Sequence, residues 1–180
     1  MMATDPTIRL MNAVGEAALG RVRRLFGEFA TEFDPLVAAI FEVQGFAAEV
    51  AGLPGRYAPP SGCLILAVVS DSPAGCVAMR DLGGGTCELK RLYVAAPHRG
   101  RGVARLLVEA VLQRAEQLGY RRMVLDTLPE MAGAIALYRR YGFVATAAYW
   151  GHPAEHAVFL EKPLAHEATP TGGTPWLASG

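Results

Sequence analysis

The sequence lacks an excess of either charge, a long apolar run and any sizeable set of cysteines, and each absence excludes a class of protein. Lys and Arg together number 17, and so do Asp and Glu. This balance argues against a nucleic-acid partner and against binding to an acidic membrane surface. No uninterrupted apolar stretch approaches the roughly 20 residues that a membrane-spanning helix needs. Residues 1–12 also lack the basic and apolar segments of a signal peptide, so we expect a cytoplasmic protein.

The three cysteines do not form the pattern of a disulfide framework. Cys63, Cys76 and Cys87 are odd in number, lie in strand-like apolar runs and include no C-x-x-C pair. We interpret them as small buried hydrophobic residues in a reducing compartment. We expect neither a disulfide nor a metal site.

The first third of the chain predicts one strand followed by two helices. Apolar and polar residues alternate over 7–13, as in an edge strand, and apolar residues recur at helical spacing over 16–33. A second helix is expected from Asp34 to Gly52. Asp34 is a favourable N-cap, and Gly52 is a favourable stop.

The rest of the chain predicts six strands and two helices. The strands are expected at 63–70, 76–82, 86–95, 122–127, 143–149 and 156–164, with a turn at 71–75 and a glycine hairpin at 83–85. One helix ends at Gly119 and the other spans 129–141. This order predicts a single α/β domain over 1–164. The helix that ends at Gly119 connects the strands at 86–95 and 122–127, and such a crossover makes these two strands parallel. The Thr-, Gly- and Pro-rich residues 165–180 are expected to be a disordered tail.

The stretch Arg99, Gly100, Arg101, Gly102 lies where an apolar strand gives way to a helix. A helix N-terminus offers unpaired N–H groups and a partial positive charge, and glycines let a ligand approach the backbone. Arginines there supply charge-assisted hydrogen bonds to phosphate. We interpret the stretch as a pyrophosphate site, and the alternative is a solvated basic loop. It lacks the Lys-Ser/Thr of a Walker loop and the third glycine of G-x-G-x-x-G, which disfavours a nucleotide-binding domain.

Two motifs within residues 88–143 carry a family resemblance. The pattern R/Q-x-x-G-x-G/A is matched by Arg99, Gly102 and Ala104, and ALYxxxGF is matched by "ALYRRYGF" at 136–143. With strand–helix–strand–helix spacing, the chain resembles the GNAT superfamily of acetyl-CoA-dependent N-acetyltransferases. The resemblance implies a mixed, mostly antiparallel sheet with flanking helices, and a central parallel strand pair that splays apart after a bulge.

The resemblance also implies that coenzyme A lies in the cleft between the splayed strands. Backbone groups of Leu92 and Val94 would contact the pantetheine arm, and the Val94 N–H would polarise the thioester carbonyl. The implied donor-binding residues are Leu92, Tyr93, Val94, Arg99, Gly100, Arg101, Gly102, Val103, Ala104 and Arg105. Many members carry Asn at the position of Met131, where it helps to hold the donor's amide.

Acetyl transfer to an amine requires an acid for the departing thiolate and a base for the amine. Tyr138 matches the family's usual acid, and the alternative is that its ring only packs helix on sheet. Glu88 is the candidate base, and the alternative is an exposed residue paired with Lys90 or Arg91. His152 and His156 are rival bases or solvated loop residues.

The acceptor side of the site is predicted from position alone. The candidates are Tyr57, Tyr149, Trp150 and His152, although the aromatic residues could equally cover a sheet edge. The expected reaction is acetyl transfer from acetyl-CoA to a primary amine. A small-molecule amine is the first candidate, and a protein N-terminus or lysine is the second. The alternative function is an inactive acyl-CoA-binding module. The sequence leaves the oligomeric state open, with a homodimer through the C-terminal strand as one alternative.

Overall fold

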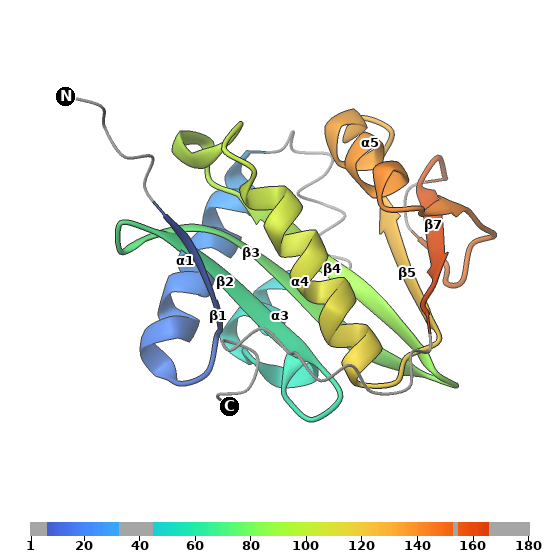
Figure 1. Cartoon of the computed structure of the whole chain (residues 1–180), viewed down its shortest axis with the longest axis horizontal. Helices are drawn as coiled ribbons and strands as arrows, with labels where there is room; N and C mark the ends of the chain where they lie inside the picture. The colour runs from blue at the N-terminus through green and yellow to red at the C-terminus, as the bar shows by residue number, and fades with distance from the viewer. Residues whose placement is uncertain (1–6, 33–44, 153–154, 166–180) are drawn as a thin grey trace.

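The computed structural model describes residues 7–32, 45–152 and 155–165. The described residues form a seven-stranded sheet in the order β1-β2-β3-β4-β5-β7-β6. Figure 1 shows helix α4 across one face of this sheet and helices α1 and α3 on the other. The predicted mixed α/β architecture is confirmed, and the predicted tail over 165–180 lies outside the described residues except for Ala165.

The N-terminal part follows the prediction up to residue 32. Strand β1 (Ile8–Asn12) is an edge strand antiparallel to β2 (Cys63–Val69), and helix α1 spans Glu16–Thr31. Most of the predicted second helix lies outside the described residues. Its end is α3 (Phe46–Ala51), followed by a short 3₁₀ turn, η1 (Gly55–Tyr57). A continuous helix to Gly52 is wrong, because Gly45 is left-handed, with φ of 72°, and α3 starts after it.

The central strands form an antiparallel meander of β2, β3 (Ser72–Gly83) and β4 (Thr86–Val94). Strand β3 begins at Ser72, so the predicted turn over 71–75 is wrong. The chain reverses within Ser70 and Asp71, which both have positive φ, and this tight turn lets the next residues pair with β2 directly. The glycine hairpin before β4 is confirmed.

The C-terminal part brings a parallel strand next to β4. Its elements are α4 (Val103–Gln117), β5 (Arg122–Thr127), α5 (Ala132–Arg140), β6 (Val144–Ala145) and β7 (Val158–Pro163). Strands β4 and β5 are parallel, as predicted. Strand β6 is much shorter than the predicted 143–149, because Tyr149 turns inward and its hydroxyl binds Glu88 on β4.

Each face of the sheet carries its own hydrophobic core. Side chains of β2 alternate between the two, with Ile65 in the core under α4 and Leu64 in the core under α1. A strand buried on both faces reads as a continuous apolar run. Cys63, Cys76 and Cys87 are buried and free, as predicted for small hydrophobic residues.

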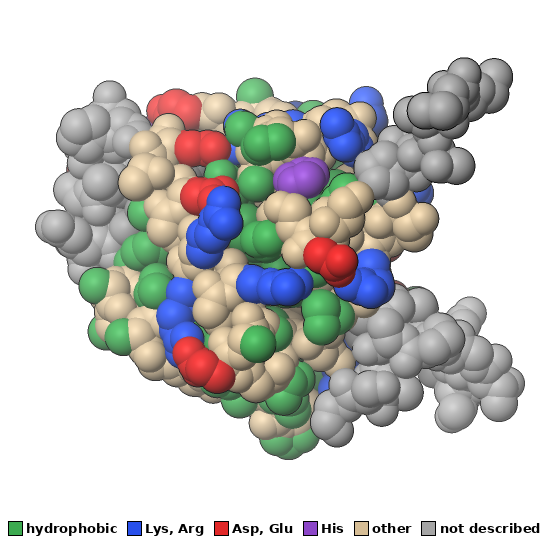
Figure 2. Space-filling view, turned by 90° about the vertical axis from the view of Figure 1, so that its left-hand side faces the viewer, with side chains coloured by type: hydrophobic (Ala, Val, Ile, Leu, Met, Phe, Trp, Pro, Cys, Tyr) green, Lys and Arg blue, Asp and Glu red, His purple; other side chains and the backbone are tan. Residues whose placement is uncertain are grey.

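Charged side chains are distributed over the outer surface. Lys and Arg are interspersed with Asp and Glu on the face drawn in Figure 2, in keeping with the equal numbers of the two kinds. Of the helices that the structure describes, none has the length and apolar content needed to cross a bilayer.

Gly75 is required where β3, β4 and α4 meet. A Cβ atom at this position would lie 2.6 Å from the carbonyl oxygen of Tyr93 and 3.2 Å from Leu107. We expect Gly75→Ala to cost about 1–3 kcal/mol of stability, a typical cost of overpacking, and to lower Tm by several degrees in a thermal melt.

A matched control is Gly20→Ala in helix α1, where an added Cβ meets nothing within 4 Å. Alanine is the better helix former, so this variant should melt at or above the wild-type temperature. A wild-type Tm for Gly75→Ala would contradict the close approach of the two strands.

Candidate active site

Strands β4 and β5 separate part of the way along their length. They pair from Thr86 to Glu88 on β4, opposite Arg122 to Val124 on β5, and their recorded pairing ends there. Both strands continue, to Val94 and Thr127. The predicted splay of the parallel pair is therefore present.

A bulge in β4 accompanies this separation. Between the pairs Ala78–Lys90 and Cys76–Tyr93, Arg91 and Leu92 lie opposite a single residue of β3. Arg91 has a φ of 58°, and its guanidinium is held by two hydrogen bonds to Glu49 on α3, of 2.8 and 3.0 Å. The extra residue reverses the alternation of side chains. Leu92 therefore packs toward the α4 face, as Leu89 does three residues earlier.

A cavity of about 470 Å³ lies between the end of β4, the start of α4 and helix α5, and we call it the loop cavity. The residues that line it are Phe29, Glu32, Leu92, Tyr93, Val94, His98, Arg99, Gly100, Gly102, Val103, Ala104, Met131, Gly133, Ala134 and Leu137. These include every residue predicted to bind the acetyl donor except Arg101 and Arg105. Met131 also lines the wall of this cavity.

The turn into α4 presents backbone rather than side chains. Gly100 and Gly102 are left-handed, with φ of 74° and 81°, and Gly102 is the N-cap of the helix. No side-chain hydrogen bond caps this end of α4. The first N–H groups of the helix therefore stay open to an anion at the loop cavity.

The side chains of the three arginines near the turn point to different places. Arg99 donates from Nε to the Val94 carbonyl at 2.9 Å and from its terminal nitrogen to Glu32. Arg105 pairs along the helix with Glu109 at 3.1 Å, and Arg101 is exposed. Only Arg99 lines the loop cavity.

Glu32 lies beside Arg99 as a charged carboxylate. It also accepts a hydrogen bond of 2.8 Å from the Tyr93 hydroxyl. Burial raises the pKa of Glu32, but the contacts with Arg99 and Tyr93 outweigh it and hold that pKa below its ordinary value. The mouth of the loop cavity thus contains a cation and an anion that bind each other.

The backbone of Val94 is oriented by its neighbour. The N–H of Ala95 donates to the Ala74 carbonyl on β3 at 3.0 Å. Because backbone groups alternate along a strand, the N–H of Val94 points away from β3 toward the opening between β4 and β5. One backbone donor therefore faces the cleft at the end of β4.

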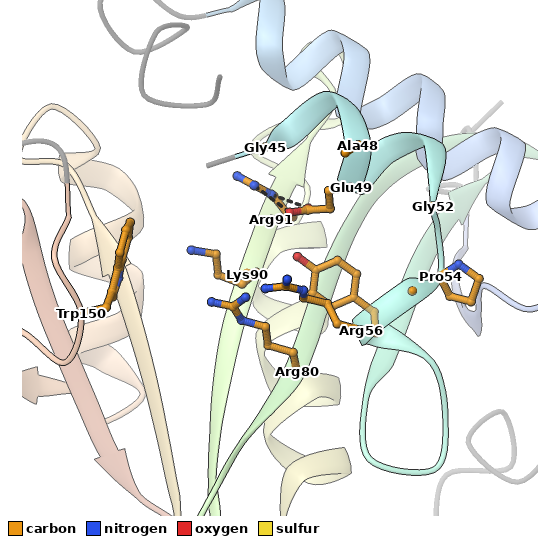
Figure 3. A pocket seen from close by; sticks show the side chains of 12 residues that line it. Gly45, Ala48, Glu49, Gly52, Pro54, Arg56, Arg80, Lys90, Arg91 and Trp150 are labelled. Atoms are coloured by element: carbon orange, nitrogen blue, oxygen red, sulfur yellow. Dashed lines mark hydrogen bonds and ion pairs between the residues drawn. The ribbon is translucent and has the colours of Figure 1, made fainter. Parts of the chain in front are cut away.

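A second cavity, of about 550 Å³, lies beside the start of the bulge, and we call it the arginine cavity. Figure 3 shows Lys90 and Arg80 extending into it between the α3–η1 wall and Trp150. Its charged and aromatic lining residues are Glu49, Arg56, Tyr57, Arg80, Lys90, Arg91 and Trp150. Of the predicted acceptor residues, Tyr57 and Trp150 line this cavity, and Tyr149 and His152 do not.

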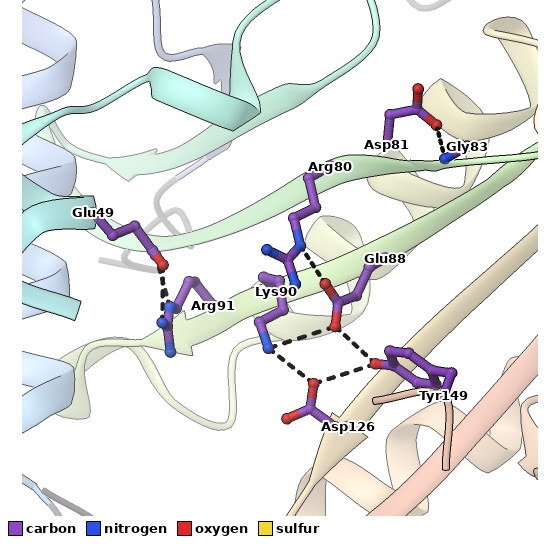
Figure 4. A network of polar contacts seen from close by, with 9 residues as sticks. All are labelled: Glu49, Arg80, Asp81, Gly83, Glu88, Lys90, Arg91, Asp126 and Tyr149. Carbon is purple, nitrogen blue, oxygen red and sulfur yellow. Dashed lines mark hydrogen bonds and ion pairs between the residues drawn. The ribbon is translucent and has the colours of Figure 1, made fainter. Parts of the chain in front are cut away.

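Two buried carboxylates lie behind the arginine cavity in one polar network (Figure 4). Glu88 is fully buried and accepts hydrogen bonds from Arg80 and, at 2.8 Å, from the Tyr149 hydroxyl. Asp126 accepts from Lys90 at 2.8 Å and from the same hydroxyl at 3.2 Å. The network joins β4 to β5 beyond the point where their backbones part.

The network fixes the charge states of two of its members. Burial raises the pKa of Asp126, but the charge and hydrogen bond of Lys90 outweigh it, so that pKa lies below its ordinary value. Burial, Glu88 and Asp126 all raise the pKa of Tyr149, which stays protonated and donates to both carboxylates. The phenol therefore links the two anions.

The histidines occupy different environments. His152 is almost fully buried, with Nε2 3.4 Å from Asp126, whereas His156 is exposed and lies 3.7 Å from Glu130. His152 therefore adjoins the network, and His156 is not joined to it. Among the described residues, no group of three or more His, Cys, Asp or Glu side chains could hold a metal ion.

Tyr138 lies on the buried side of α5. Its side chain is 5% exposed, and its ring centroid is 5.7 Å from that of Phe143. Burial and the charge of Asp126 raise the pKa of Tyr138 above its ordinary value, so the phenol carries its proton. Packing of the ring is thus observed, and proton transfer stays a prediction.

Sequence reasoning missed Asp126, Arg80 and the tie between Arg91 and Glu49. Asp126 was the detectable one, because it is a lone acid in an apolar strand that was expected to lie beside Glu88 and Lys90. The alternative of an exposed Glu88 paired with Lys90 is wrong in its exposure, since the carboxylate is fully buried, although Lys90 does lie 3.6 Å from it. Its partner Arg80 was hidden because it lies eight residues away, across the hairpin.

Comparisons with known proteins agree with this geometry. The family model described as acetyltransferase (GNAT) family matches residues 24–143. An uncharacterized N-acetyltransferase of Schizosaccharomyces pombe is 41% identical over 118 residues, which are 64% of this chain and 72% of that protein.

Two solved structures share the fold. An acetyltransferase of the GNAT family from Staphylococcus aureus has 13% identity and a TM-score of 0.72 over 88% of this chain and 100% of that one. The PaiA N-acetyltransferase from Thermoplasma acidophilum, in complex with coenzyme A, has 12% identity and a TM-score of 0.69 over 87% and 99% of the two chains. With the family match over most of its length, the chain belongs to the acetyltransferase (GNAT) family and is an acyl-CoA-dependent N-acetyltransferase.

Proposed function

We propose that this protein moves an acetyl group from acetyl-CoA to the primary amine of a small molecule. The observation that carries the proposal is the separation of β4 from β5 beside a helix N-terminus that no side chain caps. The arginine cavity adjoins this opening along β4, and its volume of about 550 Å³ lies within the range of small-molecule sites.

The residues around the loop cavity fit the acetyl donor. The amides from Arg99 to Arg105 would bind the pyrophosphate, with Gly100 and Gly102 permitting close approach. The N–H of Val94 would bind the thioester carbonyl oxygen, and Leu92 would line the pantetheine arm. Met131 would give this arm an apolar contact in place of an amide hydrogen bond.

Arg99 and Glu32 would change partners when the donor binds. Phosphate oxygens compete with the Glu32 carboxylate for the Arg99 guanidinium, which is well suited to either anion. The Arg99 bond to the Val94 carbonyl is independent of that exchange. It would keep the guanidinium at the end of β4 in both states.

Glu88 is the proposed base for the amine. A carboxylate is a weak base compared with an amine, and Glu88 is fully buried, so a water molecule would relay the proton from the amine. Asp126 contacts the same Lys90 and Tyr149 side chains as Glu88. When Glu88 takes up a proton, these two side chains would still have the Asp126 carboxylate as a partner. His152, beside Asp126, is the rival base.

Tyr138 is the proposed acid for the leaving thiolate. Its raised pKa widens the gap to a thiol, which titrates near ~8.5 in water. The same poorly solvated surroundings also disfavour a thiolate and raise the pKa of its thiol. The two groups therefore stay matched well enough for proton transfer.

Two further proposals concern where the protein acts and with what it assembles. We propose the cytoplasm as its location, because the thiols of Cys63, Cys76 and Cys87 are all free. A homodimer through the C-terminal strand is retained as a proposal. Gel filtration of the full chain would test it.

The direct test is a panel of primary amines with acetyl-CoA, followed by release of free thiol. We expect turnover with a subset of small amines, and both CoA and acetyl-CoA should raise Tm because they bind the native state. Binding of CoA without turnover of any amine would favour an inactive acyl-CoA-binding module. Absence of a Tm shift at millimolar CoA would remove the donor site altogether.

The loop is tested by Gly102→Val. We expect the variant to fold but to lose the Tm shift with CoA, because a β-branched side chain would stand where phosphate meets the backbone. The matched control is Gly119→Val, at the other end of α4. Gly119 is also left-handed, and neither position has an atom within 4 Å of an added Cβ. Both variants should lose similar stability, and equal CoA binding by both would contradict the proposed site.

The acid is tested by Tyr138→Phe, which keeps the ring and its packing on Phe143. We expect single-turnover rates to fall by roughly 10²–10⁴ while acetyl-CoA affinity is kept, because only the proton donor is lost. The control is Tyr141→Phe, which removes a nearby hydroxyl that binds Glu109; neither tyrosine is among the residues that line the loop cavity. Wild-type single-turnover rates in the Tyr138 variant would assign this residue to packing alone.

A further inference from the structure

The arginine cavity is lined by more positive than negative charge. Four cations line it, Arg56, Arg80, Lys90 and Arg91, and its one lining carboxylate is Glu49. Such a concentration of like charge in a partly enclosed space is unfavourable unless counter-charges lie close by. The carboxylates that touch these cations therefore decide what the cavity can bind.

Three of the four cations have an internal carboxylate partner. Arg91 is held by Glu49 through two hydrogen bonds. Behind the lining, Arg80 binds Glu88 and Lys90 binds Asp126. Arg56 is the fourth cation of the lining and has no such partner, since no carboxylate among the described residues contacts it. Its side chain is exposed at the η1 turn.

Arg80 has donors to spare as well. Its bond to Glu88 uses Nε, and no hydrogen bond within the described chain uses its two terminal nitrogens. A guanidinium carries five N–H donors in a planar fork that matches carboxylate or phosphate oxygens. Figure 3 shows Arg56 and Arg80 directed into the same cavity from the turn η1 and from strand β3.

The opposite wall of the cavity is aromatic. Trp150 lines it, and the Nζ of Lys90 lies 5.8 Å from the centroid of the Trp150 ring. The indole nitrogen of Trp150 is buried and has no hydrogen-bond acceptor among the described residues. A ligand in this cavity would therefore meet guanidinium groups on one side and an indole on the other.

We propose that the acetyl acceptor is an amine that also carries an oxyanion, a carboxylate or a phosphate, and that Arg56 and Arg80 bind this group. The inference rests on the proposed acetyl transfer and narrows its substrate class. The oxyanion supplies the counter-charge that Arg56 lacks. Since Arg80 also contacts Glu88, an acceptor bound to Arg80 lies next to the proposed base.

The same charges affect the amine of the acceptor. The cations of the lining repel a second positive charge, so an acceptor that carries only ammonium groups is disfavoured. A polyamine or another acceptor without an anionic group would add positive charge to a cavity that has an excess of it. The cavity thus selects for an acceptor that carries an oxyanion.

The test compares acceptors that differ only in the anionic group. One set is phenylalanine, phenylalaninamide and 2-phenylethylamine, and the other is O-phosphoethanolamine and ethanolamine. We expect kcat/KM to be at least ~10-fold higher for the anionic member of at least one set. The amide is the stricter comparison, because its amine titrates near ~8 and is more often neutral at pH 7.

The variant is Arg56→Gln, which removes the charge at an exposed position. For the favoured anionic amine, kcat/KM should fall roughly 10- to 100-fold through KM, whereas kcat/KM for the amines that lack an anionic group should not fall. Arg56→Lys should recover part of the loss. Arg21→Gln, at an exposed arginine of α1 outside the cavity, is the matched control.

A second measurement does not depend on turnover. In the presence of CoA, 3-phenylpropanoate should raise the Tm of the wild-type protein and not that of Arg56→Gln, because it has the carboxylate but no amine. Neutral amines that react as well as the anionic ones would overturn the inference and leave the proposed function intact. CoA binding without turnover of any amine would instead overturn the proposed function.

Discussion

The bulge at Arg91 is the constraint on which both cavities depend. Without the extra residue, strict alternation would place Leu92 on the same face as Lys90, and the end of β4 would present the wrong side chains to the loop cavity. With it, Lys90 faces the arginine cavity and Leu92 faces the loop cavity. A non-glycine residue with positive φ is strained. The two hydrogen bonds that the Arg91 guanidinium donates to Glu49 offset that strain and connect α3 to the sheet at the same point.

The buried carboxylates explain how β4 and β5 hold together where their backbones part. Glu88 and Asp126 belong to different strands, and Lys90 and Tyr149 bind both. Burying two anions is costly, and removing any one partner would leave a charge unpaired in a poorly solvated place. A network of this kind therefore ties β4 to β5 across the cleft while keeping two carboxylates behind the arginine cavity.

Most of the fold could be predicted from the sequence, because its signals are local. The apolar run of β2, the glycine hairpin and the strand at 122–127 each follow from neighbouring residues. Two of the failures have non-local causes. Strand β6 ends early because Tyr149 binds a carboxylate 61 residues away, and Glu88 is buried because Arg80 lies opposite it across a hairpin. The loop residues follow from a motif, whereas Arg80 and Arg56 acquire a role only from packing.

Overall charge and local charge are independent properties of this chain. Equal numbers of acidic and basic residues predict no polyanionic partner, yet cations from η1, β3 and β4 converge on one cavity. Three of the four cations are paired with carboxylates of the protein itself, so the excess positive charge at the cavity is small and lies at Arg56. A surplus of this size suits a single oxyanion on a small acceptor. Nucleic acids and acidic membranes are bound instead by extended basic surfaces.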